Sequence, residues 1–118
     1  MTIFRKILSA NDVGATGTHQ SGILVPKFEA IRPPFPQLNA AQKNPDAPLK
    51  CVDENGRSHC LRFVYYNNKL HDDDGTRDEY RITHIMNYLK DTHAEHGDAI
   101  QLWWDDAVGT YRILIVRR

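Results

Sequence analysis

Three charged side chains of alternating sign stand at every second position of one short segment: Arg77, Glu79 and Arg81. In an extended chain, residues two apart point to the same side, so we expect these three to share one strand face. A guanidinium can donate two parallel hydrogen bonds to one planar acceptor, and an ionised carboxylate only accepts them. The row can therefore be a salt-bridge ladder on an exposed sheet, or it can read the base edges of a G·C step.

A polar stretch at residues 9–20 is the second candidate. It holds two glycines and His19, and its one β-branched apolar residue is Val13. Because apolar stretches flank it at residues 3–8 and 22–25, we expect a long exposed loop between two strands. Its hydroxyl and amide side chains can hydrogen-bond to phosphates or to base edges. On composition alone, His19 fits an ordinary surface position better than a contact.

Catalytic patterns are missing from the sequence. None of the six lysines follows an acidic residue at a spacing of two, as nucleases of the metal-dependent restriction type require. None of the six histidines precedes a lysine at that spacing, and no glycine-rich phosphate loop ends in Gly-Lys-Ser/Thr. We therefore expect a binding module with no catalytic residues, no cofactor and no metal site.

Two clusters leave a metal-dependent hydrolase open as an alternative. His71 precedes three aspartates at residues 72–74, and Glu95 lies between His93 and His96. Histidines three residues apart can supply two ligands to one metal ion. A solvated turn and a polar connection explain the same residues more simply, and we favour these interpretations.

The elements that must position these residues are mostly strands. Apolar patterns between turn-forming residues predict seven short strands, at residues 3–8, 22–25, 49–53, 58–66, 79–83, 100–104 and 110–116. Two short helices are expected at residues 27–31 and 85–90, and polar loops at residues 37–48 and 67–78. Many short strands with few helices indicate an open barrel or a sandwich.

The two cysteines bracket a predicted hairpin. Asn55-Gly56 is a strong signal for a two-residue turn. That register places Cys51 opposite Cys60, close enough for a disulfide. A reducing cytoplasm favours two free buried thiols instead.

The chain of 118 residues is neutral, with 15 basic and 15 acidic residues. Its first 50 residues hold six basic and three acidic residues, and the remainder hold nine and twelve. Neutrality predicts weak non-specific affinity for nucleic acid. Because no apolar run reaches the ~20 residues that span a bilayer and no signal peptide is visible, we expect a cytoplasmic protein with no membrane partner.

The polar stretch also carries a resemblance to a known family. Two blocks carry it, the first being Leu8-Ser9-Ala10-Asn11-Asp12, Gly14-Ala15-Thr16-Gly17, His19-Gln20 and Gly22, and the second Tyr65-Tyr66-Asn67, Thr76-Arg77, Glu79 and Arg81-Ile82-Thr83. These blocks resemble the N-terminal effector-DNA-binding domain of EcoRII-type restriction endonucleases. The resemblance implies a mostly-β, seven-stranded open pseudobarrel of the plant B-three type with two short helices. It also implies that two arms grip a short, GC-rich, pseudopalindromic duplex site (CCWGG-like) in the major groove.

The resemblance further implies which residues contact DNA. They are Ser9, Asn11, Asp12, Thr16, Gly17, Thr18, His19 and Gln20 in the first arm, and Arg77, Asp78, Glu79, Tyr80 and Arg81 in the second. It favours base reading over a salt-bridge ladder, and a contact role for His19. The chain departs from the family at Leu24, where the family has a tyrosine, and at Gly75 and Tyr80, where the family has lysines, which removes cationic contacts.

We therefore expect a single DNA-binding domain over residues 1–118 that is monomeric when isolated. Its partner is double-stranded DNA, and the resemblance implies a covalently linked nuclease domain in a longer restriction enzyme. A second alternative is a protein-interaction β-barrel that uses exposed sheet edges or Trp104. Such a protein would show no salt-dependent affinity for duplex DNA.

Overall fold

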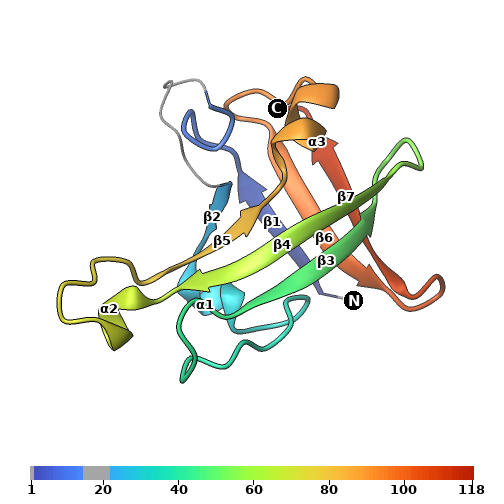
Figure 1. Ribbon diagram of the computed structural model, residues 1–118. Coiled ribbons are helices and arrows are strands. Elements are labelled where there is room, and N and C mark those ends of the chain that lie inside the picture. The colour runs from blue at the N-terminus through green and yellow to red at the C-terminus, as the bar shows by residue number, and fades with distance from the viewer. Residues whose placement is uncertain (1, 15–21) are drawn as a thin grey trace.

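The structure, a computed structural model, describes residues 2–14 and 22–118, and in this part of the chain seven strands form one curled sheet (Figure 1). The strands are β1 (Ile3–Ile7), β2 (Ile23–Val25), β3 (Asp46–Val52), β4 (Ser58–Tyr66), β5 (Glu79–Thr83), β6 (Ala99–Asp105) and β7 (Thr110–Val116). Their order across the sheet is β1-β6-β7-β3-β4-β5-β2. Neighbours are antiparallel except β3 and β7, which run parallel. Each predicted strand is present, and the mostly-β open pseudobarrel is confirmed.

The helices are short. The two predicted ones are α1 (Lys27–Ala30) and α3 (Met86–Asp91). A further helix, α2 (Asn68–His71), lies within the segment predicted as the second polar loop. With only four residues, α2 is too short to show a helical period in the sequence. None of the described helices has the length and apolar character needed to cross a bilayer.

The sheet curls until its two edge strands are linked by one side chain. Lys6 Nζ, on β1, donates to the carbonyl oxygen of Leu24 on β2 at 2.6 Å. The same ammonium group lies 3.1 Å from Asp12 Oδ2, in the segment that follows β1. Lys6 therefore joins the open edges of the pseudobarrel.

Aromatic rings fill the inside of the curl. Phe35 contacts Phe4 edge to face, with ring centroids 5.0 Å apart, and stacks on Phe63 at 4.6 Å. Phe63 lies 5.7 Å from Tyr80, which in turn stacks on Tyr65 at 4.1 Å. Because alternate residues of a strand point to opposite sides, the intervening polar residues of β4 and β5 face outward.

Strand β3 begins earlier than predicted. Residues 37–48 were expected to form a loop, but β3 starts at Asp46 and includes Pro48. Proline lacks the N–H that a central strand needs. At Pro48, β3 pairs with β4 alone, because its pairing with β7 is limited to Cys51 and Val52. The strand therefore has an open side that tolerates proline.

The hairpin between β3 and β4 does not have the predicted register. Asp53 Oδ1 accepts hydrogen bonds from the backbone N–H groups of Asn55 at 2.8 Å and Arg57 at 2.9 Å, so the turn closes on Asp53 and Arg57. The register shifts by one residue, and Cys51 and Cys60 no longer face each other. Both are free; Cys51 is buried and Cys60 is exposed. The predicted pairing and the predicted burial of Cys60 are wrong.

Asp98 gives a prediction about acid stability. Its carboxylate accepts hydrogen bonds from the backbone N–H groups of Glu95 and Arg118 and from the Arg117 guanidinium, at 2.8, 3.1 and 3.1 Å, and these bonds lower its pKa below 3.8. Because the unfolded chain then binds the proton first, this stabilisation is complete above the ordinary pKa and is lost as the pH falls through the lower folded value. We expect Asp98→Asn to lower the free energy of unfolding at pH 7, and the difference from wild type to shrink below about pH 4.

Urea unfolding at pH 7 and pH 3 measures this difference. Asp73→Asn, at an exposed position, is the matched control and should leave both values unchanged. If the loss of unfolding free energy caused by Asp98→Asn stayed constant with pH, the carboxylate charge would not be what stabilises the contacts around Asp98.

Candidate nucleic-acid interface

Arg77, Glu79 and Arg81, called the charged row below, are joined by hydrogen bonds on the outer side of β5. Arg77 Nε donates to Glu79 Oε1 at 2.8 Å, and Arg81 Nε donates to Glu79 Oε2 at 3.1 Å. Partial burial opposes ionisation of Glu79, but the hydrogen bonds from Arg77 and then Arg81 outweigh it and lower the pKa of Glu79. The predicted shared face is confirmed, and the row carries two guanidinium groups against one carboxylate.

Tyr66, at the end of β4, supports the charged row. Its ring centroid lies 3.7 Å from Arg77 Cζ, within cation–π range, and Tyr66 is the ladder partner of Glu79. Arg62 continues the outward face of β4: its Nη1 lies 3.4 Å from the Tyr66 hydroxyl, and its Nε donates to Asp46 at 2.6 Å. Tyr66 and Arg62 were not among the predicted contact residues, although alternation along β4 places both on the same face as the charged row.

Arg81 ties the charged row to Gly22, the residue that precedes β2. Its Nη1 donates to the carbonyl oxygen of Gly22 at 3.2 Å, and Arg81 is the ladder partner of Leu24. Gly22 has a φ of +80°, and a Cβ at this position would lie 1.8 Å from the carbonyl oxygen of Ile82. Glycine is therefore required where the chain enters β2, directly beside β5.

The first loop, residues 9–20, is described as far as Gly14. The Ser9 N–H donates to Asp12 Oδ2 at 2.9 Å, and the Asp12 N–H donates to Ser9 Oγ at 3.1 Å. Asp12 is 4% exposed and also pairs with Lys6, whereas Ser9 and Asn11 are exposed. Asp12 thus anchors the start of the loop. The other predicted contacts of this loop lie outside the described residues: Thr16, Gly17, Thr18, His19 and Gln20.

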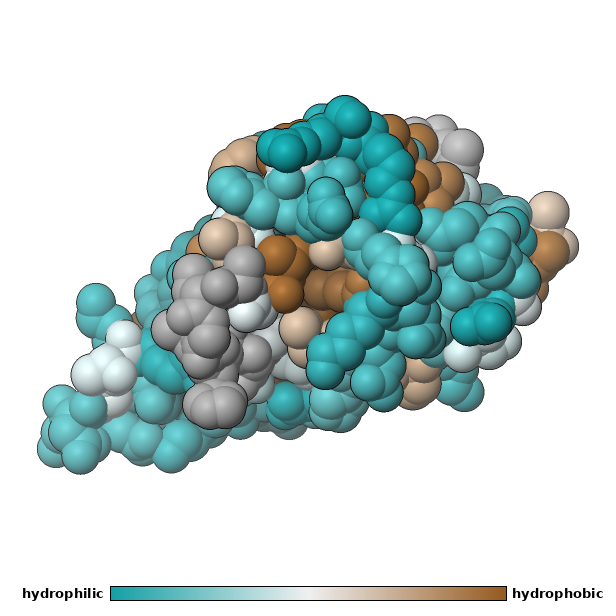
Figure 2. All heavy atoms as spheres, turned by 90° about the horizontal axis from the view of Figure 1, so that it is seen from above, coloured by the Kyte–Doolittle hydropathy of each residue, from teal (hydrophilic) through white to brown (hydrophobic). Residues whose placement is uncertain are grey.

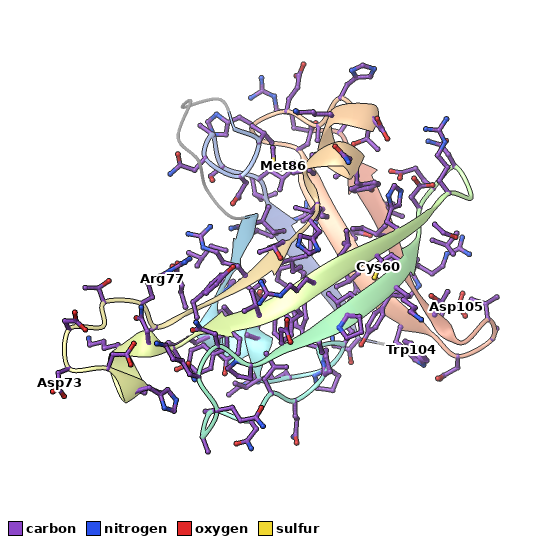
Figure 3. All side chains as sticks on the ribbon, in the orientation of Figure 1. Cys60, Asp73, Arg77, Met86, Trp104 and Asp105 are labelled. Carbon is purple, nitrogen blue, oxygen red and sulfur yellow. The ribbon has the colours of Figure 1, made fainter. Side chains whose placement is uncertain are left out.

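The described start of the first loop rests on α3. Val13 and Met86 both pack against the core cluster, and together with Leu89 they line one pocket at this end of the molecule. Seen from above, this end is mostly polar with apolar atoms in a central hollow (Figure 2), and Met86 lies beside the first loop (Figure 3). The described start of the loop is therefore attached to the core on its apolar side.

Asp78 and Tyr80, two further predicted contacts, point away from the charged row. Asp78 Oδ2 accepts a hydrogen bond from Lys27 Nζ at 2.6 Å, and its Oδ1 accepts one from the hydroxyl of Tyr65. These bonds, first from Lys27 and then from Tyr65, lower the pKa of Asp78. Tyr80 is 9% exposed and stacks on Tyr65. Both side chains fix the start of β5 to α1 and to the core.

The second loop, residues 67–78, is folded tightly on α2. Asn68 Oδ1 accepts the Arg77 N–H at 2.7 Å, and the Lys69 N–H donates to the Arg77 carbonyl at 3.1 Å. A Cβ on Gly75 would lie 2.2 Å from the carbonyl oxygen of Asn68. A residue with a side chain, such as lysine, would therefore not fit this backbone. In Figure 3 the loop extends from Arg77 at its base to the region of Asp73.

The two clusters considered as metal ligands do not come together. Among residues 2–14 and 22–118, no three His, Cys, Asp or Glu side chains are arranged so that they could hold a metal ion. His71 Nε2 lies 3.0 Å from the carbonyl oxygen of Ala40, and Asp72 pairs with Lys43 at 2.6 Å. Both side chains instead hold the second loop against residues 40–43.

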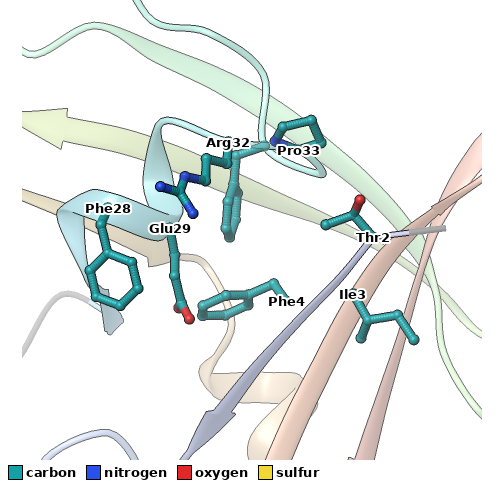
Figure 4. Close-up of a pocket in the computed structure, with 8 residues that line it drawn as sticks. Thr2, Ile3, Phe4, Phe28, Glu29, Arg32 and Pro33 are labelled. Atoms are coloured by element: carbon teal, nitrogen blue, oxygen red, sulfur yellow. The ribbon is translucent and has the colours of Figure 1, made fainter.

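Apolar surfaces lie elsewhere on the molecule. A pocket of about 360 Å³ lies between α1 and the start of β1, with Phe28 and Glu29 among its lining residues (Figure 4). Trp104, 42% exposed, and Asp105 lie at the opposite end of the molecule from the second loop (Figure 3). These surfaces are suited to apolar partners, whereas the charged row is suited to a ligand rich in hydrogen-bond donors and acceptors.

Comparisons with known proteins agree with this fold and place the chain in a family. The model of the family described as "Restriction endonuclease EcoRII, N-terminal" matches residues 1–102, so the chain belongs to this family. The type II restriction enzyme EcoRII of Escherichia coli is 36% identical over 89 residues, covering 69% of this chain. The match covers only 20% of that enzyme, so this chain spans about a fifth of the length of its curated relative.

A solved structure supports the same architecture. The Arabidopsis FUS3–DNA complex superimposes with a TM-score of 0.73, covering 98% of this chain and 95% of that chain at 20% sequence identity. At this identity the match concerns the fold. It confirms the B-three-like pseudobarrel expected from the sequence.

Proposed function

We propose that this chain recognises double-stranded DNA in a sequence-specific manner, using the first loop and the charged row with its second loop as two arms in the major groove. The observation that carries the proposal is the hydrogen bond from Arg81 to Gly22, which joins the charged row to the residue that precedes β2, just past the first loop. Membership of the EcoRII N-terminal family and a fold match to a protein in complex with DNA support the same ligand.

The charged row has the chemistry to read a G·C step. Arginine can donate two hydrogen bonds to guanine O6 and N7, and a carboxylate can accept one from cytosine N4. Each oxygen of Glu79 accepts one hydrogen bond from an arginine, which leaves a further lone pair on each for a base. Because Glu79 and Tyr66 already hold the guanidinium of Arg77, less side-chain entropy is lost on binding. The target we propose is a short, GC-rich, pseudopalindromic site (CCWGG-like).

The predicted contact residues divide into two roles. We assign Ser9, Asn11, Arg77, Glu79 and Arg81 to the DNA surface, together with the sequence-based candidates of the first loop. Asp12, Asp78 and Tyr80 position the arms, because their side chains are engaged with Lys6, Lys27 and Tyr65, respectively. A single chain presents two different arms, so each half of a pseudopalindromic site is read by different residues.

The parent protein we propose is a restriction endonuclease with a covalently linked nuclease domain, since the chain spans about a fifth of its relative in Escherichia coli. The chain itself is expected to bind labelled duplex in EDTA as a monomer and to leave the duplex intact after magnesium is added. Gel-shift and cleavage assays on the pure chain check both points. Strand cleavage, or binding that requires the metal, would instead support a metal-dependent hydrolase.

Glu79→Gln tests base reading directly. An amide both donates and accepts, so we expect the preference for cytosine to relax at one position of the site while other positions keep theirs. Affinities for a panel of single-base variants at one fixed salt concentration measure this. If Glu79 served only as a ladder partner of the arginines, affinity for all sequences would stay level or rise with unchanged base preference.

A further inference from the structure

A third segment, residues 39–44, is bonded to the base of the second loop through Asn67. Asn67 is fully buried, and its side-chain Oδ1 accepts the Asn44 N–H at 2.7 Å. Its Nδ2 donates to the carbonyl oxygens of Gln42 at 2.9 Å and Ala40 at 3.3 Å. In return, Asn44 Oδ1 accepts the Asn67 N–H at 3.1 Å. Three hydrogen bonds of the buried Asn67 side chain and one of its backbone N–H therefore join segments more than 20 residues apart.

Two contacts extend this attachment along the second loop. Lys43 pairs with Asp72 at 2.6 Å, and the Ala40 carbonyl oxygen lies 3.0 Å from His71 Nε2. These contacts are exposed and contribute little individually. The buried Asn67 is different, because its loss would leave the Gln42 carbonyl oxygen without its donor and would take from the Ala40 carbonyl oxygen its partner other than His71.

Asn67 lies between two of the side chains that fix Arg77. The preceding residue, Tyr66, places its ring 3.7 Å from Arg77 Cζ. The following residue, Asn68, accepts the Arg77 N–H at 2.7 Å. A displacement of the backbone at Asn67 would therefore move both the ring beneath the Arg77 guanidinium and the acceptor of its backbone N–H.

We infer that Asn67 and residues 39–44 are positioning elements that set where the second loop presents Arg77 to DNA. The inference rests on the proposed function for its effect on binding, but the attachment itself is a property of the free protein. Neither Asn67 nor residues 39–44 touch the ligand in this account. They act through Tyr66 and Asn68, so their loss should affect discrimination at the bases read by Arg77 before it affects those read by the first loop.

The main test replaces Asn67 by aspartate, which keeps the size and the acceptor but turns two donors into a carboxylate facing two carbonyl oxygens. We expect discrimination to fall about tenfold at the positions that Arg77→Ala also affects, with other positions unchanged; tenfold corresponds to losing one good base contact. Ile113→Val, a core deletion on β7 away from both loops, is the control for stability loss and should leave all base preferences unchanged.

A second pair of variants tests the same inference if Asn67→Asp does not fold. Asn44 has a φ of +51°, so Asn44→Gly keeps the backbone conformation and removes only the side-chain acceptor of the Asn67 N–H. Asn44→Asp keeps an acceptor oxygen and is the rescue control. We expect Asn44→Gly to reduce discrimination at the Arg77 positions several-fold, and Asn44→Asp to bind like wild type.

Hydrogen–deuterium exchange on the free proteins separates the inference from the proposed function. We expect Asn44→Gly to raise exchange in residues 40–44 and 67–77 together, and Asn44→Asp to leave both protected. If wild type fails to select any duplex site, the proposed function is wrong, and exchange still decides whether the attachment holds. Uncoupled exchange, or variants that lose discrimination no more than Ile113→Val does, would overturn the inference.

Discussion

Gly22→Ala is expected to destabilise the protein by at least ~2 kcal/mol and to abolish specific DNA binding. Gly22 has a φ of +80°, and the added Cβ would meet the Ile82 carbonyl oxygen at 1.8 Å. Since neither the carbonyl nor its strand can move alone, β2 would separate from β5. Gly22, whose carbonyl oxygen is the acceptor of Arg81, would move with it.

Gly56→Ala is the matched control for this experiment. Gly56 has nearly the same φ, +78°, but a Cβ there would meet nothing within 4 Å. Only the backbone strain remains, so we expect a loss of about 1 kcal/mol and unchanged DNA binding. Urea unfolding of both variants measures the difference. Equal losses would mean that the contact between Gly22 and β5 adds nothing beyond the backbone conformation.

Arg81→Lys is expected to weaken specific binding by about 1–3 kcal/mol while non-specific binding stays unchanged. Lysine keeps the charge but cannot make a bidentate contact with guanine. Nor does it reproduce the fork with which Arg81 holds Glu79 and the Gly22 carbonyl oxygen together. Titrations of the selected site and of an unrelated duplex at several salt concentrations separate specific from non-specific binding, because the charge of the protein sets the salt dependence.

Arg57→Lys, at the exposed tip of the β3–β4 hairpin, is the control and should change neither affinity. If Arg81→Lys bound the selected site as wild type does, the row would act through charge alone. A parallel loss for both duplexes would show that the substitution damages the whole surface rather than its base reading.

Alternation and local turn signals predicted much of the fold. β4, β5 and β7 have the predicted bounds, because polar or turn-forming residues flank each of them, and β5 also alternates cleanly. The same alternation put the charged row on one face, and it also places Asp78 and Tyr80 on the other. The orientation of these two side chains away from the charged row could therefore be predicted from the sequence, although the family resemblance grouped them with the DNA contacts.

Long-range polar contacts could not be predicted. The attachment of Asn67 to residues 40–44 joins two polar segments that carry no periodicity. The hairpin register depended on the Asp53 carboxylate, which accepts two backbone N–H groups and overrides the turn that Asn55-Gly56 favours. Only glycine fits at position 22 because the backbone of β5 lies so close to it. This distance is determined by the folded sheet and not by the local sequence.

The most direct test of the account is selection of bound duplexes from a random pool by the isolated chain, in EDTA at physiological salt. We expect enrichment of one short, GC-rich, pseudopalindromic sequence, and we expect Arg77→Ala and Arg81→Lys to lose preference at G·C positions. A pool that remains unenriched after repeated rounds, or an enriched site that these two variants select with wild-type preference, would contradict it.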